Sequence, residues 1–236
     1  MSTGSTSTPE PAAGPSDGDP AYTLWAVLRR DVRARERARE SGEPLLDAIR
    51  SVEATGVALR GLYDVSGLRA DADLLIWLTG PTADGLQRSL RTLRRSAELV
   101  TLLPTWNALG VHREAEFSRN HAPAFLRGLP PKAWVTVYPF VRSYDWYLLP
   151  EDERRTMLAD HGRKGSEYPQ VQTNTVASFA LGDYEWILAL EADDPVDLVD
   201  LMRHLRNTEA RRHVREEVPF FTGRRVSIDE LPEILA

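Results

Sequence analysis

Cysteine is absent from this chain of 236 residues, and histidine is scarce, with five residues. The missing thiols exclude disulfides, thiolate nucleophiles and cysteine-ligated metal sites. A bound metal ion would therefore need His, carboxylate, Tyr or Met ligands. A chain without cysteine is also compatible with a reducing compartment. Together with the missing membrane and signal segments described next, this leads us to expect a cytoplasmic protein.

Long apolar runs and concentrated positive charge are also missing. No segment approaches the roughly 20 apolar residues that a membrane-spanning helix needs, and the N-terminus lacks the basic start and apolar core of a signal peptide. The formal net charge is -6, and the arginines alternate with acids, as in ERRTML. We therefore expect neither a membrane span nor a nucleic-acid partner.

The opening residues 1–20, MSTGSTSTPEPAAGPSDGDP, consist mostly of Ser, Thr, Pro, Gly and Ala. Such a segment buries too little apolar surface to offset the entropy lost on ordering, so we predict a disordered tail there. From Tyr22 onward, apolar periodicity predicts the order βαββαβ within residues 21–120. The expected elements are a strand at Thr23–Val32, a helix at Pro44–Thr55, strands at Val57–Tyr63 and Asp73–Thr79, a helix at Thr82–Leu99 and a strand at Leu103–His112.

The same order returns within residues 121–236. The expected elements are a strand at Trp134–Arg142, a helix at Pro150–His161, strands at Val171–Leu181 and Tyr184–Glu191, a helix at Val196–Val214 and a strand at Phe220–Val226. A repeat is supported by Leu86–Arg91 (LQRSLR) and Leu201–Arg206 (LMRHLR), which share two Leu and two Arg at the same spacing. We therefore expect an α+β fold in which two βαββαβ halves form a barrel-like domain, its interior either filled by side chains or holding a ligand.

The strand at Trp134–Arg142 has two different faces, because side chains alternate along a strand. Tyr138, Phe140 and Arg142 share a large, partly aromatic face, whereas Val135 and Val137 belong to a small apolar face that suits a position beneath helices. The aromatic face has two interpretations. It is either an ordinary core or the wall of a ligand cavity.

The helix that follows begins at Pro150, and Gly162 is suited to end it in the left-handed conformation. His161 then lies in the last turn and shares a face with Met157 and Leu158, which points it at the sheet. A histidine there is either a favourable cap of the helix or an inward-facing ligand. With the aromatic strand and Arg142, an inward histidine suits a flat, apolar macrocycle that carries carboxylates and a metal, such as haem or a haem precursor.

At this point the residues resemble a known family. The segment YPFVRSYDWYLLPEDERRTMLADHG is similar to the signature of coproheme decarboxylases, which are members of the chlorite-dismutase-like haem superfamily. YEWILALEADDP, HLRNTEARRHV and PFFTGRRV also resemble that family, and the likeness extends from about His121 to the C-terminus. It implies duplicated ferredoxin-like halves of the dimeric α+β barrel type, one haem-type site in the half formed by residues 121–236, and a homopentamer.

The resemblance also implies an activity: oxidative decarboxylation of iron coproporphyrin III (coproheme) to haem b by hydrogen peroxide, with the substrate serving as redox cofactor. It implies a transient ferrochelatase contact as well. His161 matches the proximal iron ligand, Tyr138 the tyrosine that is oxidised to a radical, and His121 the distal base of the actinobacterial branch. The remaining matches lie beside the propionates or the porphyrin edge, and these are Arg142, Trp146 and Arg206.

Some positions depart from the other branch of the family. Phe140 and Arg142 stand where that branch has Met and Lys, and Thr173 or Asn174 stands near its distal Gln. Three alternatives stay open. The first is a chlorite dismutase or haem peroxidase with a distal arginine, for which Arg127 is one candidate. The others are a haem-binding or regulatory barrel without catalysis, and a barrel without any cofactor.

Overall fold

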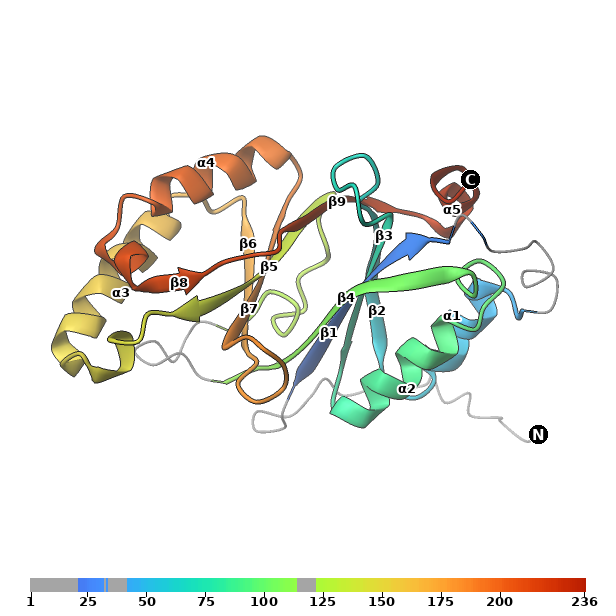
Figure 1. Ribbon diagram of the computed structural model, residues 1–236, viewed down its shortest axis with the longest axis horizontal. Helices are drawn as coiled ribbons and strands as arrows, with labels where there is room; N and C mark the ends of the chain where they lie inside the picture. The colour runs from blue at the N-terminus through green and yellow to red at the C-terminus, as the bar shows by residue number, and fades with distance from the viewer. Residues whose placement is uncertain (1–20, 32, 34–41, 114–121) are drawn as a thin grey trace, which may run out of the picture.

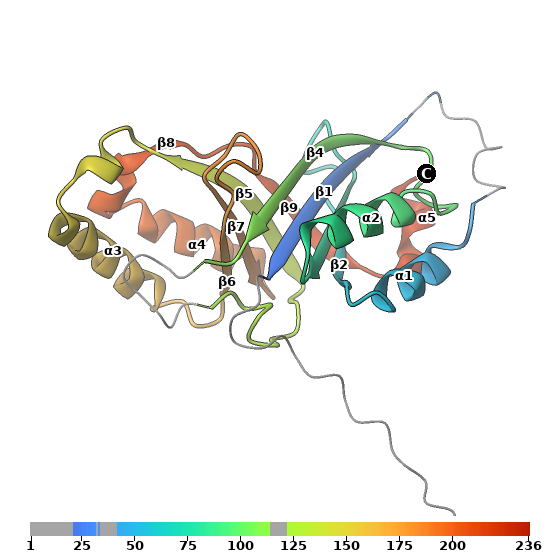
Figure 2. The same cartoon turned by 90° about the horizontal axis from the view of Figure 1, so that it is seen from below.

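The strands lie at the centre of the molecule and the helices lie at its two ends (Figures 1 and 2). The computed structural model describes residues 21–31, 33, 42–113 and 122–236. The predicted tail at residues 1–20, His121 and the expected boundary between the halves fall outside these ranges. No helix within the described ranges is long and apolar enough to cross a membrane.

Each half has the predicted order of elements. The first half comprises β1 (Tyr22–Arg30), α1 (Leu45–Glu53), β2 (Ala58–Asp64), β3 (Leu74–Gly80), α2 (Ala83–Leu93) and β4 (Leu102–Val111). The second half comprises β5 (Trp134–Arg142), η2 (Trp146–Leu148), α3 (Glu151–Gly165), β6 (Gln172–Ala177), β7 (Trp186–Ala192), α4 (Pro195–Leu205), η3 (Glu209–His213), β8 (Val214–Glu216) and β9 (Phe221–Val226). A short tail of η4 (Ile228–Glu230) and α5 (Leu231–Ile234) follows.

The strand order shows that the halves are duplicates. In the first half the order across the sheet is β4-β1-β3-β2, and in the second half the corresponding strands follow as β9-β5-β7-β6. The fourth strand of each half pairs with the second strand of the other, through β4–β6 and β2–β9. These pairings close the strands into a ring, and β8 extends it beside the end of β5. The predicted duplicated ferredoxin-like architecture is confirmed.

Side chains fill the interior of the ring. Trp25 and Trp77 lie with their ring centroids 5.4 Å apart, and Trp106 lies 5.2 Å from Phe221. Valines of β5 and alanines of β4 and β7 pack around them, so this core is continuous across both halves. Of the two alternatives for the interior, the structure therefore shows the filled one.

The helices cover the outer faces of the sheet. In the first half, α1, α2 and the C-terminal residues Leu231 and Leu235 pack on β1 and β3. In the second half, α4 packs on β5 and β7 through Leu198 and Leu201. The prediction about the faces of β5 was wrong in one respect. Its valine face points into the ring, and its aromatic face lies beneath the helices, because the interior is already crowded with tryptophans.

Three predicted helix ends were also wrong. α2 ends at Leu93 rather than Leu99. α4 ends at Leu205 rather than Val214, because the chain turns after Leu205 to place β8 beside β5. α3 continues to Gly165, and Gly162 is not among the described glycines with positive φ. A glycine inside a helix costs only about 1 kcal/mol relative to alanine, and the ion pairs of Arg163 with Asp160 and Glu167 continue past it.

A buried ion pair joins the two halves at one end of the ring. Arg60 of β2 lies 2.6 Å from the carboxylate of Glu191 in β7, and the side chains are 7% and 0% exposed. Asn174 also donates to Glu191, at 3.0 Å, and Arg60 lies over the Trp77 ring. The pair is fully hydrogen-bonded, so it tolerates burial, but either charge alone would be costly.

We therefore predict that Glu191→Gln lowers the free energy of unfolding by about 3 kcal/mol, because Arg60 would keep its charge without a compensating carboxylate. Chemical denaturation of the purified protein measures this. The control is Arg88→Gln, which breaks the exposed pair with Asp84 and should change stability little. Equal effects of the two substitutions would contradict the importance of the buried pair.

Candidate functional site

Tyr138 lies at the centre of the outer face of β5, where α4 and Phe220, the residue before β9, cover it. Its side chain is 4% exposed, and its ring stacks on Phe220 at 4.4 Å between centroids. Its hydroxyl donates to the sulfur of Met202 in α4 at 3.5 Å, which is a weak hydrogen bond. Burial raises the pKa of Tyr138 above its ordinary value. The phenol is therefore protonated at neutral pH and held in a largely apolar surround.

Charged groups lie close enough to influence this phenol. The negative charge of Glu217 raises the pKa of Tyr138 further, whereas the positive charges of Arg206 and Arg211 lower it. Glu217 binds both arginines: Arg206 Nη1 lies 2.9 Å from Oε1, and Arg211 Nη1 lies 2.8 Å from Oε2. The residues come from the end of α4, from η3 and from the chain just after β8, which the turn after Leu205 brings together.

Arg142, at the end of β5, is sandwiched between aromatic rings. Its guanidinium carbon lies 4.1 Å from the ring centroid of Trp146 and 5.0 Å from that of Phe140. Trp146 is 2% exposed and also contacts the ring of His213, 5.4 Å away. Stacking on two aromatic rings fixes the plane of the guanidinium, so Arg142 presents a positioned positive charge.

His161 lies on the half-buried face of α3 together with Met157 and Leu158, as the spacing predicted. Burial lowers the pKa of His161 below its ordinary value, and the positive charge of Arg142 lowers it further. The imidazole is therefore neutral at pH 7. Its Nδ1 atom is buried and has no hydrogen-bond partner among the described residues. A neutral imidazole with an unsatisfied nitrogen is suited to bind a metal.

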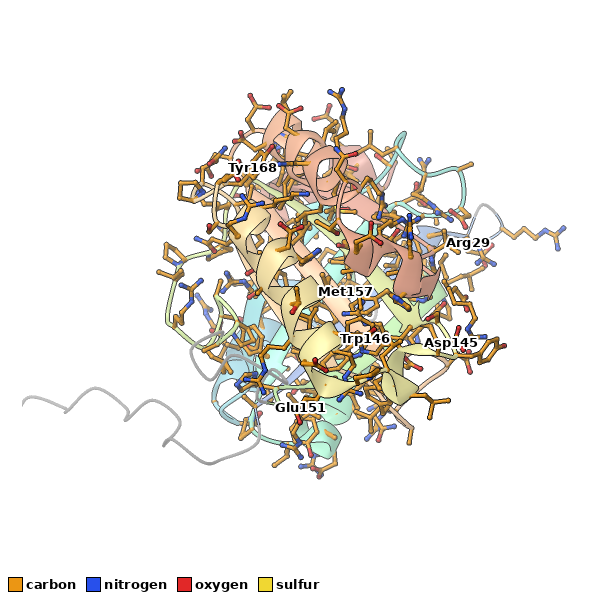
Figure 3. The ribbon with its side chains drawn as sticks, turned by 90° about the vertical axis from the view of Figure 1, so that its left-hand side faces the viewer. Arg29, Asp145, Trp146, Glu151, Met157 and Tyr168 are labelled. Carbon is orange, nitrogen blue, oxygen red and sulfur yellow. The ribbon has the colours of Figure 1, made fainter. Side chains whose placement is uncertain are left out.

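α3 is held loosely for a helix of 15 residues. None of its residues is fully buried, and its main contacts are with α4 and η3 rather than with the strands. Figure 3 looks onto α3, which runs from Glu151 past Met157, with Trp146 close to its first turns. A cavity of about 420 Å³ opens between α3 and η3, and it is lined by Asp152, Glu153, Thr156, Met157, Glu209, Arg212 and His213.

Met157 and His213 line that cavity, whereas Tyr138, Arg142, Trp146, His161 and Arg206 do not. Its wall at His213 contacts Trp146, and Ser143 Oγ lies 3.0 Å from His213 Nδ1. His213 falls within the long helix that the sequence predicts, but it lies at the end of η3, against Ser143, the residue that follows β5. The cavity thus lies on the far side of His213 from Trp146, which stacks on Arg142.

The residues present fit an iron porphyrin with carboxylate substituents. Among the residues that the structure describes, no three His, Asp or Glu side chains gather into a metal site. A metal at His161 would therefore have one protein ligand, as it has in a haem site with a single axial histidine. Arg142 and Arg206 would supply positive charges for its carboxylates, and Tyr138, Trp146 and Met157 would supply apolar surface.

The structure thus brings five of the six predicted site residues to one side of the second half, namely Tyr138, Arg142, Trp146, His161 and Arg206. The sixth, His121, lies outside the described residues. Asn174 is 0% exposed and faces the interior of the ring, where it accepts from the backbone N–H of Phe125. Of the pair Thr173 and Asn174, only Thr173 can face the helices.

Sequence reasoning missed Glu217, Arg211, Met202 and Phe220. The last three lie within or next to segments that resembled the family, but no spacing rule connects them to Tyr138. Glu217 precedes PFFTGRRV by two positions and carries no pattern of its own. A charged residue just beyond a predicted helix end, followed by an aromatic strand, was the one available signal.

Comparisons with known proteins place the chain. The chlorite dismutase family model matches residues 35–226. A coproheme decarboxylase of Mycolicibacterium smegmatis is 52% identical over 200 residues, which is 81% of this chain and 87% of that protein. A coproheme decarboxylase of Staphylococcus saprophyticus is 23% identical over 229 residues, 90% of this chain and 91% of that protein.

Solved structures agree on the fold. Chlorite dismutase from Candidatus Nitrospira defluvii in complex with imidazole superposes with a TM-score of 0.74 at 18% identity, covering 92% of this chain and 95% of that one. At that identity the likeness establishes the architecture alone. From the family model and the relative with 52% identity, we conclude that this chain belongs to the chlorite dismutase family.

Proposed function

We propose that this protein decarboxylates coproheme oxidatively to haem b with hydrogen peroxide as the oxidant. The observation that carries the proposal is a buried phenol, Tyr138, which lies beneath α4 in the field of Arg206 and Arg211, with the neutral His161 on α3, the helix packed against α4. The 52% identity with a coproheme decarboxylase supports it independently. The half formed by residues 121–236 would hold the whole site.

The reaction converts each reacting propionate into a vinyl group. One propionate, one hydrogen peroxide and one proton give one vinyl group, one carbon dioxide and two waters, so the propionate loses two electrons and peroxide gains them. Two propionates must react, and two peroxides are consumed for each haem b. The iron of the bound substrate supplies the redox chemistry with peroxide.

His161 would bind the iron from the side of α3. Because burial and Arg142 keep the imidazole neutral, a lone pair is available without first losing a proton at neutral pH. The unpartnered Nδ1 supports this role, since a buried imidazole nitrogen without a partner otherwise costs free energy.

Tyr138 would remove the hydrogen atom from the β-carbon of the propionate after its own oxidation. Its raised pKa keeps the phenol protonated, so a hydrogen atom rather than a bare electron is exchanged at its oxygen. Phe220 and Met202 exclude water from the ring. That surround protects a reactive phenoxyl group from side reactions.

The remaining predicted site residues would position the substrate and move a proton. Arg142 and Arg206 would bind propionates, with Arg142 held flat by Trp146 at the porphyrin edge. We propose His121 as the distal base that moves a proton between the oxygens of peroxide. A cytoplasmic homopentamer that contacts a ferrochelatase transiently completes the proposal.

The decisive experiment is incubation of the protein with iron coproporphyrin III and stepwise addition of peroxide, with products separated by chromatography and identified by mass. We expect a mono-decarboxylated intermediate, then haem b, with two peroxides consumed. Bleaching of the porphyrin without vinyl products would instead indicate a haem-binding protein without this activity. Rapid conversion of chlorite to chloride and dioxygen would favour a chlorite dismutase.

A further inference from the structure

Glu217 forms an ion-pair cluster that the proposed chemistry has not yet used. Its carboxylate is bound by Arg206 and Arg211 at 2.8–2.9 Å, and its side chain is 15% exposed. The arginines are more exposed, at 38% and 39%. Two cations thus converge on one carboxylate, and nothing in this geometry is specific to the carboxylate of a glutamate.

The cluster lies where a substrate carboxylate is needed. Phe220, three residues after Glu217, stacks on the ring of Tyr138, and Met202, four residues before Arg206, accepts from its hydroxyl, so the cluster lies beside the phenol. A propionate that reacts at Tyr138 must bring its own carboxylate into this region. Two carboxylates held by the same arginines would repel each other, so one must leave.

Glu217 is free to leave because its backbone belongs to no strand. β8 ends at Glu216, β9 begins at Phe221, and residues 217–220 are irregular. The next residue, Val218, is exposed, and the side chain of Glu217 is itself 15% exposed, so the segment lies at the surface. Arg206 and Arg211, in contrast, are anchored at the end of α4 and in η3.

We propose that Glu217 is an internal substitute for the reacting propionate: it pairs with Arg206 and Arg211 when no substrate carboxylate is bound and is exchanged for that carboxylate on binding. This inference rests on the proposed function. Because one ion pair replaces another, the exchange has a small net free energy, and the arginines remain paired throughout. Once the propionate has become a vinyl group, Glu217 regains both arginines, and the porphyrin is free to turn and present its second propionate.

The test uses metal-free porphyrins, so that no turnover occurs. Coproporphyrin III carries propionates at the two positions where protoporphyrin IX carries vinyl groups, and both keep the other two propionates. Titration into the full chain, followed by tryptophan fluorescence, gives the dissociation constants. We expect Glu217→Gln to bind coproporphyrin III about tenfold more tightly, which corresponds to about 1.4 kcal/mol, with protoporphyrin IX unchanged.

Glu216→Gln is the matched control, because it removes the same charge one residue earlier from an exposed side chain. We expect it to change neither affinity. If Glu217→Gln weakens the binding of coproporphyrin III, or changes the affinities for both porphyrins by the same factor, Glu217 has only a structural role and the inference fails.

Arg211→Met provides a second test that does not depend on the folding of Glu217→Gln. This variant should bind coproporphyrin III more weakly and protoporphyrin IX with unchanged affinity. An equal loss of affinity for both porphyrins would overturn the inference. Wild-type protein that binds neither porphyrin would overturn the proposed function as well. If wild-type protein binds both porphyrins and Glu217→Gln keeps the wild-type ratio of the two dissociation constants, this inference alone is overturned.

Discussion

Tyr138→Phe is expected to give a protein that folds and binds coproheme but makes no haem b. Phenylalanine keeps the ring that stacks on Phe220, and only the weak hydrogen bond to Met202 is lost. The free energy of unfolding should therefore change by no more than about 1 kcal/mol. Without the phenolic oxygen no hydrogen atom can be taken from the propionate, and neither the mono-decarboxylated intermediate nor haem b should form.

The measurement is the product distribution after peroxide addition, together with a coproheme titration that shows normal binding. Tyr147→Phe is the matched control. Tyr147 lies nearby in η2, its hydroxyl donates to Glu185 at 2.9 Å, and burial raises its pKa to about 12, yet it is 43% exposed. We expect that variant to form haem b normally. If Tyr138→Phe forms haem b at the wild-type rate, Tyr138 only lines the site and another group must remove the hydrogen atom.

His161→Ala has the second large expected effect, on the binding of the iron rather than on the chemistry at the propionates. Among the described histidines, His161 is the one on the inward face of α3, and its loss removes the proposed axial ligand. Loss of a residue that supports a metal ligand typically costs 10- to 100-fold in metal affinity. Loss of the ligand itself should therefore weaken the binding of iron coproporphyrin III by at least about 100-fold. The absorption spectrum of any bound porphyrin should shift as well.

Metal-free coproporphyrin III serves as the control ligand, since its binding does not use an axial bond and should change little. His204→Ala is the control variant. His204 is a helical histidine of α4 that lies 3.7 Å from Glu167 and stays part-exposed, and its loss should leave the spectrum unaltered. An unchanged spectrum and affinity in His161→Ala would move the iron ligand to another residue.

Local rules determined much of this protein from the sequence alone. Alternation along the strand at Trp134–Arg142 placed Tyr138 on the face of Phe140 and Arg142, and helical spacing placed His161 with Met157 and Leu158. The repeated order of strands and helices predicted two similar halves. These predictions held because each depends on residues within a few positions of one another, where backbone geometry leaves little choice.

The tertiary structure decided which face of each strand is inside. The parity of β5 separates its two faces, but the pairings β4–β6 and β2–β9 close the ring and send the valines inward. The aromatic face, and with it Tyr138, therefore lies beneath α4 rather than inside the ring. No local pattern reports this, because it depends on strands that are far apart in sequence.

The same holds for the charged half of the site. Arg206, Arg211 and Glu217 meet beside Tyr138 only because α4 stops at Leu205 and the chain doubles back through η3 into β8. In the sequence, Arg206 and Arg211 lie within the expected charged helix at Val196–Val214, and Glu217 lies just beyond its end. Intrinsic propensity favours continuing that helix past Leu205. The pairing of β8 with the end of β5 outweighs that propensity, and this long-range contact brings the three side chains together in one ion-pair cluster.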